Sequence, residues 1–350
     1  MTILSIDTSC DETAAAVTRG TKILSNVIWS QASAHAKFGG VMPSLAQRMH
    51  EERIDWVIEK AIKNSKFAIN NLDAIAVTVG PGLSIALGVG IDRAKRLAIK
   101  YKKRLIAVNH LEGHILSPLA NNSQFTINNL QFPALGLVVS GGNTILVKIK
   151  NIGSYEILAQ TTDDALGEAL DKGARMLGLG YPGGAILEKL AREGNPKAYI
   201  LPIPIVGQEE RRIFTYSGLK TAFARLVESK KPLTKEKIYN LASCYQNAAF
   251  QHLIRICSYI IKNSEFKTKN LLVGGGVSAN IELRKRLRKL ARESGLSVQF
   301  PYSSKLTGDN AAMIGIAAYF KANRNEYISP NKIDRLPNFK IDSQPSPVGI

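Results

Sequence analysis

An apolar run, a short polar turn and a second apolar run occur together at two places about half a chain apart. The first is ILSI, the turn DTSCDE and TAAAV, and the second is ALGLVVSGGNTILVKIK at residues 134–150, which turns at SGGN. This pattern is typical of a β-hairpin with a polar tip. Helical periodicity follows each hairpin, at 43–63 and 84–102 in the first half and around DALGEALDKGARMLG in the second. The repeat predicts an α/β fold of two similar halves, each opening with antiparallel strands whose turn points into a shared cleft.

The length also favours two domains, since 350 residues exceed a comfortable single core. The polar stretch NNSQFTINNLQF at residues 121–132 suits a loop between the halves. We therefore expect a first domain at 1–125 and a second at 126–325. Residues 326–350 are polar and end in SQPSPVGI, which predicts a disordered tail.

The net charge of +18, from 46 Lys and Arg against 28 Asp and Glu, is more than folding requires and indicates an acidic partner such as nucleic acid. The basic runs LRKRLRKLARE (283–293) and KYKKR (100–104) are candidates for a phosphate-binding surface. Each run is also compatible with an ordinary solvated helix face.

Targeting and membrane signals point to a cytoplasmic protein. The chain opens on a strand pattern without a basic leader or cleavage site, and its three cysteines form no CxxC motif, which favours a reducing compartment. Residues 74–91 are uncharged over 18 positions, but the Gly-Pro-Gly at 80–82 divides them into a strand and a helix. We therefore expect no membrane association.

Two histidines, His110 and His114, lie four positions apart in VNHLEGHILSPLA, so a helix would present both on one face. They either ligate a metal ion together with a third residue from elsewhere, or they cap and pack. A zinc-protease helix is excluded, because Leu111 and Gly113 occupy the positions where HExxH or HxxEH requires the general base.

Glycine-rich turns precede two predicted helices in the second half. VGGGVSAN follows an apolar strand and YPGGAILEKLA follows a proline, and neither is a complete P-loop or dinucleotide motif. Such turns either let backbone N–H groups approach a phosphate or an adenosine, or simply make tight connections. Glu188 is likewise either a ribose-binding carboxylate or a favourable charge near a helix N-terminus.

Four carboxylates gather in TTDDALGEALDKGARMLG, namely Asp163, Asp164, Glu168 and Asp171. Three of them, Asp164, Glu168 and Asp171, share a helical face if the helix begins early. A bound cation or a sugar hydroxyl would stabilise such a cluster, although a solvated acidic face also fits.

The ordered motifs, taken together, resemble the TsaD family of tRNA N6-adenosine threonylcarbamoyltransferases. The matching blocks are IDTSCDET, HAKFGGVMPSLAQRMH, NHLEGH, VVSGGNT, DDALGEALDKGARMLGLGYPGG, YSGLKT, GGGVSAN and GDNAAMIG, and they extend to about Tyr319. The resemblance implies the actin-like ATPase fold, with two duplicated RNase H-like α/β domains around a central cleft. It further implies transfer of threonylcarbamoyl from threonylcarbamoyl-AMP to N6 of adenosine 37 in tRNAs reading ANN codons.

The resemblance also assigns site residues and partners. His110, His114 and Asp309 match the family's ligands for one divalent metal ion per subunit, iron(II) in preference to zinc(II). The adenylate-binding positions fall on Val138, Val139, Ser140, Gly141, Gly142, Asp171, Gly184, Glu188 and Asn280, and Asp11 and Glu12 match acidic residues linked to activity. The implied partners are tRNA, a TsaB-like protein and a TsaE-like ATPase.

Two other functions are compatible with parts of the sequence. An actin-like ATPase or sugar kinase would share the fold and the phosphate-binding hairpins, but its Mg²⁺ would have no use for histidine ligands. A non-catalytic RNA-binding subunit is suggested by the charge alone, and it would bind tRNA without forming a product.

Overall fold

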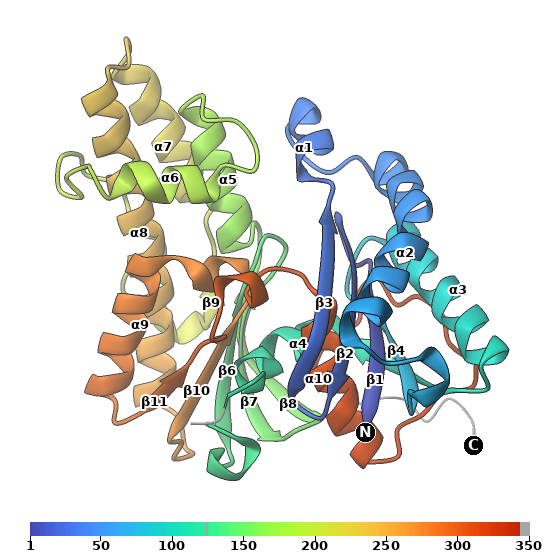
Figure 1. Cartoon of the computed structure of the whole chain (residues 1–350). Coiled ribbons are helices and arrows are strands. Elements are labelled where there is room, and N and C mark those ends of the chain that lie inside the picture. Colours follow the sequence, from blue (N-terminus) through green and yellow to red (C-terminus); the bar gives the residue numbers. More distant parts are fainter. Residues whose placement is uncertain (123–124, 344–350) are drawn as a thin grey trace. The chain divides into compact units, whose positions relative to one another are not determined.

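The computed structural model describes residues 1–122 and 125–343 (Figure 1). The chain forms two compact units. The first comprises residues 1–132, 149–156 and 299 onward, and the second comprises residues 133–148 and 157–298. These units differ from the expected ranges, because the C-terminal part of the chain returns to the first unit. The boundaries of the functional domains stay a prediction.

The first unit contains a five-stranded sheet in the order β3-β2-β1-β4-β5. Its strands are β1 (Thr2–Asp7), β2 (Glu12–Arg19), β3 (Lys22–Ser30), β4 (Ala74–Gly80) and β5 (Arg104–Asn109). The strand β1 pairs antiparallel with β2 and parallel with β4, with Ile6 opposite Ala15 and Val77. The predicted N-terminal hairpin is therefore confirmed.

Helices cover both faces of this sheet. They are α1 (Ala32–His35), α2 (Pro43–Ser65), α3 (Ser84–Lys100), α4 (His110–Leu116) and α10 (Ala311–Asn323). Leu4 and Ile6 of β1 pack into one core with residues of α2 and α3 such as Val57 and Ile91. Ser5 points the other way, and its hydroxyl donates to the carbonyl of Ala311 at 2.6 Å. Because side chains alternate along a strand, α10 lies on the face opposite α2 and α3.

The uncharged stretch at 74–91 is divided as expected, into β4 and the start of α3. Within the described residues, no helix has both the length and the apolar character needed to span a membrane.

The second sheet has the order β11-β10-β6-β7-β8-β9. Its strands are β6 (Ala134–Val139), β7 (Thr144–Asn151), β8 (Ser154–Thr161), β9 (Ile213–Phe214), β10 (Asn270–Gly274) and β11 (Ser297–Gln299). Without the short edge strand β9, and read from the other end, the order is β8-β7-β6-β10-β11. These are the third, second, first, fourth and fifth strands of this half. The first sheet has the same order, so the duplication predicted from the hairpins is present in the topology.

Five α-helices belong to the second unit: α5 (Leu166–Met176), α6 (Gly184–Ala191), α7 (Ser217–Ser229), α8 (Lys235–Lys262) and α9 (Ile281–Glu293). The strand β6 pairs parallel with β10, and a 3-10 turn at Gly276–Ala279 connects β10 to α9. This strand-turn-helix is the one expected from VGGGVSAN.

Residues 326–343, expected to be disordered, lie instead along the first unit. The Ile328 amide donates to the Leu105 carbonyl at 2.9 Å, and the Leu336 amide donates to the Val79 carbonyl at 2.6 Å. Ile333 and Ile341 are buried. The isolated apolar residues of this polar segment are the ones that anchor it. Residues 344–350 of the predicted tail lie outside the described residues.

Candidate functional site

The junction of β5 and α4 fixes the histidine pair. Asn109 caps α4, and its side-chain oxygen accepts from the Leu111 amide at 2.9 Å, so the helix begins at His110. His114 follows one turn later, and the two ring centroids lie 4.7 Å apart. Both side chains are buried. The shared helix face predicted from the spacing is therefore present.

Asp309 reaches the same point from the segment that leads into α10. Asn310 caps this helix by accepting from the Met313 amide at 3.1 Å, which leaves Asp309 immediately before the helix. The Asp309 Oδ1 atom lies 3.1 Å from Nε2 of His114 and 3.4 Å from Nε2 of His110. One ligand atom from each residue lies within 4.8 Å of the others, and in the described part of the chain this is the one such His/Cys/Asp/Glu group.

These residues fit a divalent metal ion. Two imidazole nitrogens and one carboxylate oxygen suit iron or zinc, and three protein ligands leave a coordination position for a substrate. Within the described residues, Nδ1 of both histidines and Oδ2 of Asp7 are buried without a hydrogen-bond partner.

Asp7, at the end of β1, is a site residue that the sequence interpretation missed. Its carboxylate is fully buried, and its Oδ2 lies 3.7 Å from Nδ1 of His110. It continues the face of β1 on which Ser5 contacts α10. The available signal was a charged residue directly ending a buried strand, but the interpretation assigned Asp7 to the polar turn.

The electrostatics of the cluster depend on Asp309. Burial disfavours a charged His110, but the Asp309 and Asp7 carboxylates outweigh burial and raise the pKa of His110 to about 10. Burial also acts against an ionised Asp309, yet the two histidines hold its pKa well below the usual range. Burial lowers the pKa of His114. The site therefore favours a negative carboxylate facing a positive group.

Asp11 lies in the turn between β1 and β2, and Glu12 is the first residue of β2, within electrostatic reach of Asp309. Glu12 accepts from the Ser30 hydroxyl at 3.0 Å. Burial, followed by the Asp11 and Asp309 carboxylates, raises the pKa of Glu12 to about 9. Burial and the same acidic neighbours raise the pKa of Cys10 well above its ordinary value, so this thiol is no ready nucleophile.

The second unit contains a cavity of about 300 Å³, which is within the usual range of ligand pockets. Five of the predicted adenylate-binding residues line it: Gly141, Asp171, Gly184, Glu188 and Asn280. The other lining residues, which the sequence interpretation did not assign, are Gly167, Leu170, Pro182, Ala185, Gly276, Val277 and Ala279. Most of them belong to the two glycine-rich turns, so the turns themselves were the sequence signal that could have identified these lining residues.

Side-chain to backbone hydrogen bonds hold this pocket together. The Asp171 carboxylate accepts from the amides of Gly183 at 2.9 Å and Gly184 at 2.7 Å. Glu188 accepts from the Ile281 amide at 2.9 Å. Asn280 caps α9 and donates to the Gln246 side chain at 2.9 Å. These residues therefore shape the pocket as well as line it.

The remaining predicted positions of this group lie beside the pocket. Val138 and Val139 are buried in β6, and the Ser140 amide closes the turn on the Asn143 carbonyl at 2.8 Å. Gly142 is exposed. A Cβ at Gly275 would lie 2.3 Å from the Val139 carbonyl oxygen, so that glycine serves a tight connection.

The four carboxylates after β8 do not converge on a cation site. Asp163 caps α7, accepting from the Tyr216 amide at 2.9 Å. Asp164 precedes α5, which begins at Leu166, and pairs with Lys172 and Lys220. Neighbouring lysines, rather than a bound cation, therefore compensate part of this cluster.

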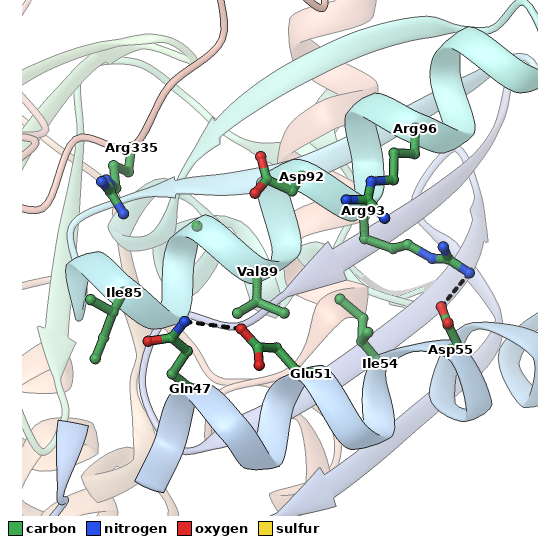
Figure 2. A pocket seen from close by; sticks show the side chains of 11 residues that line it. Gln47, Glu51, Ile54, Asp55, Ile85, Val89, Asp92, Arg93, Arg96 and Arg335 are labelled. Atoms are coloured by element: carbon green, nitrogen blue, oxygen red, sulfur yellow. Dashed lines mark hydrogen bonds and ion pairs between the residues drawn. The ribbon is translucent and has the colours of Figure 1, made fainter. Parts of the chain in front are cut away.

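A second cavity, of about 380 Å³, lies in the first unit between α2 and α3 (Figure 2). Gln47 donates to Glu51 at 2.9 Å, Arg93 pairs with Asp55, and Arg335 from the C-terminal segment lines the same cavity. Its charges are mixed, and none of the predicted site residues lines it.

Comparison with solved structures supports the fold. A full-length HypF structure in the phosphate- and nucleotide-bound form matches with a TM-score of 0.57 and 15% identity, covering 94% of this chain and 47% of that one. Component A of the (R)-2-hydroxyglutaryl-CoA dehydratase from Acidaminococcus fermentans matches with a TM-score of 0.55 and 14% identity, covering 92% and 99%. The predicted actin-like ATPase fold is thus confirmed.

Comparison of sequences shows the family. Proteins named tRNA N6-adenosine threonylcarbamoyltransferase from Moorella thermoacetica and Syntrophotalea carbinolica are 44% and 42% identical to this chain. The first match covers 97% of both chains, and the second covers 91% of this chain and 90% of the other. The family model TsaD: tRNA N6-adenosine threonylcarbamoyltransferase matches residues 22–316. The chain therefore belongs to the TsaD family of tRNA N6-adenosine threonylcarbamoyltransferases.

Proposed function

We propose that this protein transfers the threonylcarbamoyl group from threonylcarbamoyl-AMP to N6 of adenosine 37 in tRNAs reading ANN codons, forming t6A and releasing AMP. The observation that carries the proposal is the convergence of His110, His114 and Asp309 on one point, in a chain of the TsaD family. An actin-like kinase, which works with Mg²⁺ and oxygen ligands, has no use for such a cluster.

The three ligand residues would hold one divalent ion per subunit, iron(II) as our first choice and zinc(II) as the alternative. When bound, such an ion supplies Lewis-acid polarisation of a carbonyl group. The side chains themselves fix the geometry: α4 presents both Nε2 atoms, and the cap of α10 holds the Asp309 carboxylate against them.

The pocket of the second unit would take the adenylate part of the substrate. Its small lining residues Gly141, Gly184 and Gly276 leave backbone close to the cavity, and backbone N–H groups suit the phosphate of AMP. Glu188 would orient the ribose, and Asn280 would hold the start of α9 beside it. We assign Val138, Val139, Ser140 and Gly142 to the same subsite because they form the strand end and turn beside Gly141. We assign Asp171 to it because its carboxylate accepts hydrogen bonds from the amides of Gly183 and Gly184.

Attack by the adenine amino group releases a proton, for which Asp11 and Glu12 are the nearest candidates from the sequence. A Glu12 with a pKa of about 9 is protonated at neutral pH and cannot accept a proton. We therefore assign proton acceptance to Asp11. Orientation of the weakly nucleophilic amino group would supply most of the acceleration.

The proposed partners are tRNA, a TsaB-like protein and a TsaE-like ATPase, and the proposed location is the cytoplasm. The net charge of +18 supports a polyanionic substrate.

The test is an assay of the purified protein with threonylcarbamoyl-AMP, a tRNA reading an ANN codon and the partner proteins, followed by nucleoside analysis. The proposal expects t6A together with an equal amount of AMP, and no product on a tRNA in which adenosine 37 is replaced by guanosine. Folded, metal-loaded protein that forms no t6A but turns over ATP rapidly would establish the kinase alternative instead.

A further inference from the structure

The cations of α9 cover one whole side of the helix. Lys285, Arg288, Lys289 and Arg292 are all exposed, and their spacing of three, four and seven residues places them within one face. The opposite side packs into the second unit through buried Leu283, Leu287, Leu290 and Ala291. We name the four exposed cations the α9 basic face.

The charge of this helix is not balanced within it. Its 13 residues include six cations, Arg284, Lys285, Arg286, Arg288, Lys289 and Arg292, against two carboxylates, Glu282 and Glu293, which gives a net charge of +4. Arg286 pairs with Glu282 at 2.8 Å, and Lys289 lies 3.8 Å from Glu293. Like charges four residues apart on a helix are destabilising, so this arrangement favours a counter-charge from outside.

A basic cavity adjoins this face. It has a volume of about 420 Å³, and its lining includes three cations, Arg192, Lys285 and Arg286, one carboxylate, Glu282, and the amides of Gln246 and Asn247. Arg286 donates to the Asn247 side chain at 2.8 Å, which fixes its guanidinium there. Arginine, lysine and amide groups are the ones that proteins commonly use to contact phosphate oxygens.

The other basic run, KYKKR, is engaged within its own unit. Lys103 donates to the Asn70 carbonyl at 2.7 Å, Lys100 lies over the Tyr101 ring, and Arg104 lies over the Tyr327 ring. Three of the four cations therefore take part in contacts within the unit, although Lys100, Lys102 and Arg104 are exposed, and the run is the weaker candidate for a polyanion.

We propose that the α9 basic face and the cavity beside it dock the sugar-phosphate backbone of tRNA. The inference rests on the proposed function, which supplies the tRNA. The start of α9 lines the candidate adenylate pocket through Asn280, so the basic face begins next to the subsite that would hold the group donor. From Lys285 to Arg292 the face extends about 10 Å along the helix axis, enough to meet more than one phosphate.

The test compares two triple variants with equal loss of charge. One carries Lys285→Gln, Arg288→Gln and Arg292→Gln, and the matched control carries Lys100→Gln, Lys102→Gln and Lys103→Gln. Binding of a tRNA reading an ANN codon is measured at several salt concentrations with the partner proteins present. Circular dichroism and thermal unfolding confirm that each variant is folded.

We expect the α9 variant to bind tRNA at least about tenfold more weakly near 0.1 M salt, with a salt dependence reduced by roughly two to three ions, because each lost phosphate contact releases about one counterion fewer. The control should keep the wild-type salt dependence.

Equal losses in both variants would show a mere net-charge effect and overturn the proposal. Wild-type tRNA binding by the α9 variant would also overturn it, and loss of a partner protein in that variant would identify the face as a protein interface. Formation of t6A by the wild type in the same preparation shows separately whether the proposed function holds.

Discussion

Asp7 and His110 present two buried polar atoms to each other, Oδ2 and Nδ1, at 3.7 Å. A histidine that binds a metal through one nitrogen usually directs the other nitrogen at a carboxylate or a carbonyl, which fixes its tautomer. We therefore expect Asp7 to position His110 for metal binding. The sequence places both residues in recognisable motifs, yet their contact depends on β1 and β5 lying on either side of β4 in the sheet order.

Replacement of Asp7 by asparagine should weaken metal binding about tenfold, because the shape is kept while the charge facing the imidazole is lost. The measurement is competition for iron or zinc with a chromogenic chelator. Asp73→Asn is the matched control, since Asp73 accepts from the Thr2 amide at the other end of β1. The control should change stability only. Unchanged metal affinity in Asp7→Asn would refute the positioning role.

Glu12 makes folding sensitive to pH. Its pKa is raised from 4.5 to about 9, so the protonated form is favoured in the folded state. The stability from this group is fully present below pH 4.5 and is lost as the pH rises through 9. Glu12→Gln cannot titrate, so between pH 5 and 9 the free energy of unfolding of the variant should rise relative to that of the wild type, by on the order of 1 kcal/mol for each pH unit.

Urea unfolding with chelator present at several pH values measures this difference. Parallel pH profiles for wild type and Glu12→Gln would show that Glu12 titrates normally in the folded protein.

Sequence spacing identifies the histidine pair at the residue scale, because both residues lie on one short helix. Asp309 is 195 positions from His114, and no local pattern connects them. Only the family resemblance suggested this ligand, and the structure brings it to the histidines. The acidic residues after β8 show the opposite case, since their proximity in sequence suggested a cation site that their lysine and backbone partners do not form.

At the scale of elements, α10 positions Asp309 and must approach β1 and β2 closely. A Cβ at Gly315 would lie 2.6 Å from the Thr18 hydroxyl and 2.9 Å from that of Ser5. Gly315→Ala should therefore destabilise the protein by about 2 kcal/mol through overpacking. Thermal or denaturant unfolding measures the change.

Gly88→Ala in α3 is the control for this substitution. Its Cβ would meet only the far end of the Arg335 side chain, at 3.3 Å, so helix propensity should stabilise this variant by up to about 1 kcal/mol. Equal effects of the two substitutions would mean that close packing of α10 does not require Gly315.

Periodicity predicted most elements near the candidate metal site. The helix expected at 43–63 spans Pro43–Ser65, the one expected at 84–102 spans Ser84–Lys100, and both hairpins are present. The C-terminal segment was missed, because its few apolar anchors are too widely spaced to form a period. Its order comes from contacts with distant strands, such as that between Leu336 and Val79.

At the scale of the whole molecule, the two hairpins in the sequence predict the duplicated strand order. They do not predict that α10 and the C-terminal segment belong to the first unit. That return is what places Asp309 beside the histidines, since all three candidate ligands belong to the first unit. The composition predicted a polyanionic partner, and the structure shows that four cations of α9 are exposed on one face, whereas Lys103 and Arg104 of the 100–104 run contact groups of their own unit.

The most direct test of the account is a titration of metal into chelator-treated protein, with t6A formation as the readout. Wild-type activity should return in proportion to the ion bound and saturate at one ion per chain, while a folded His110→Ala protein should recover neither binding nor product. Full activity in the metal-depleted wild type, or t6A formation by His110→Ala at the wild-type rate, would contradict the account.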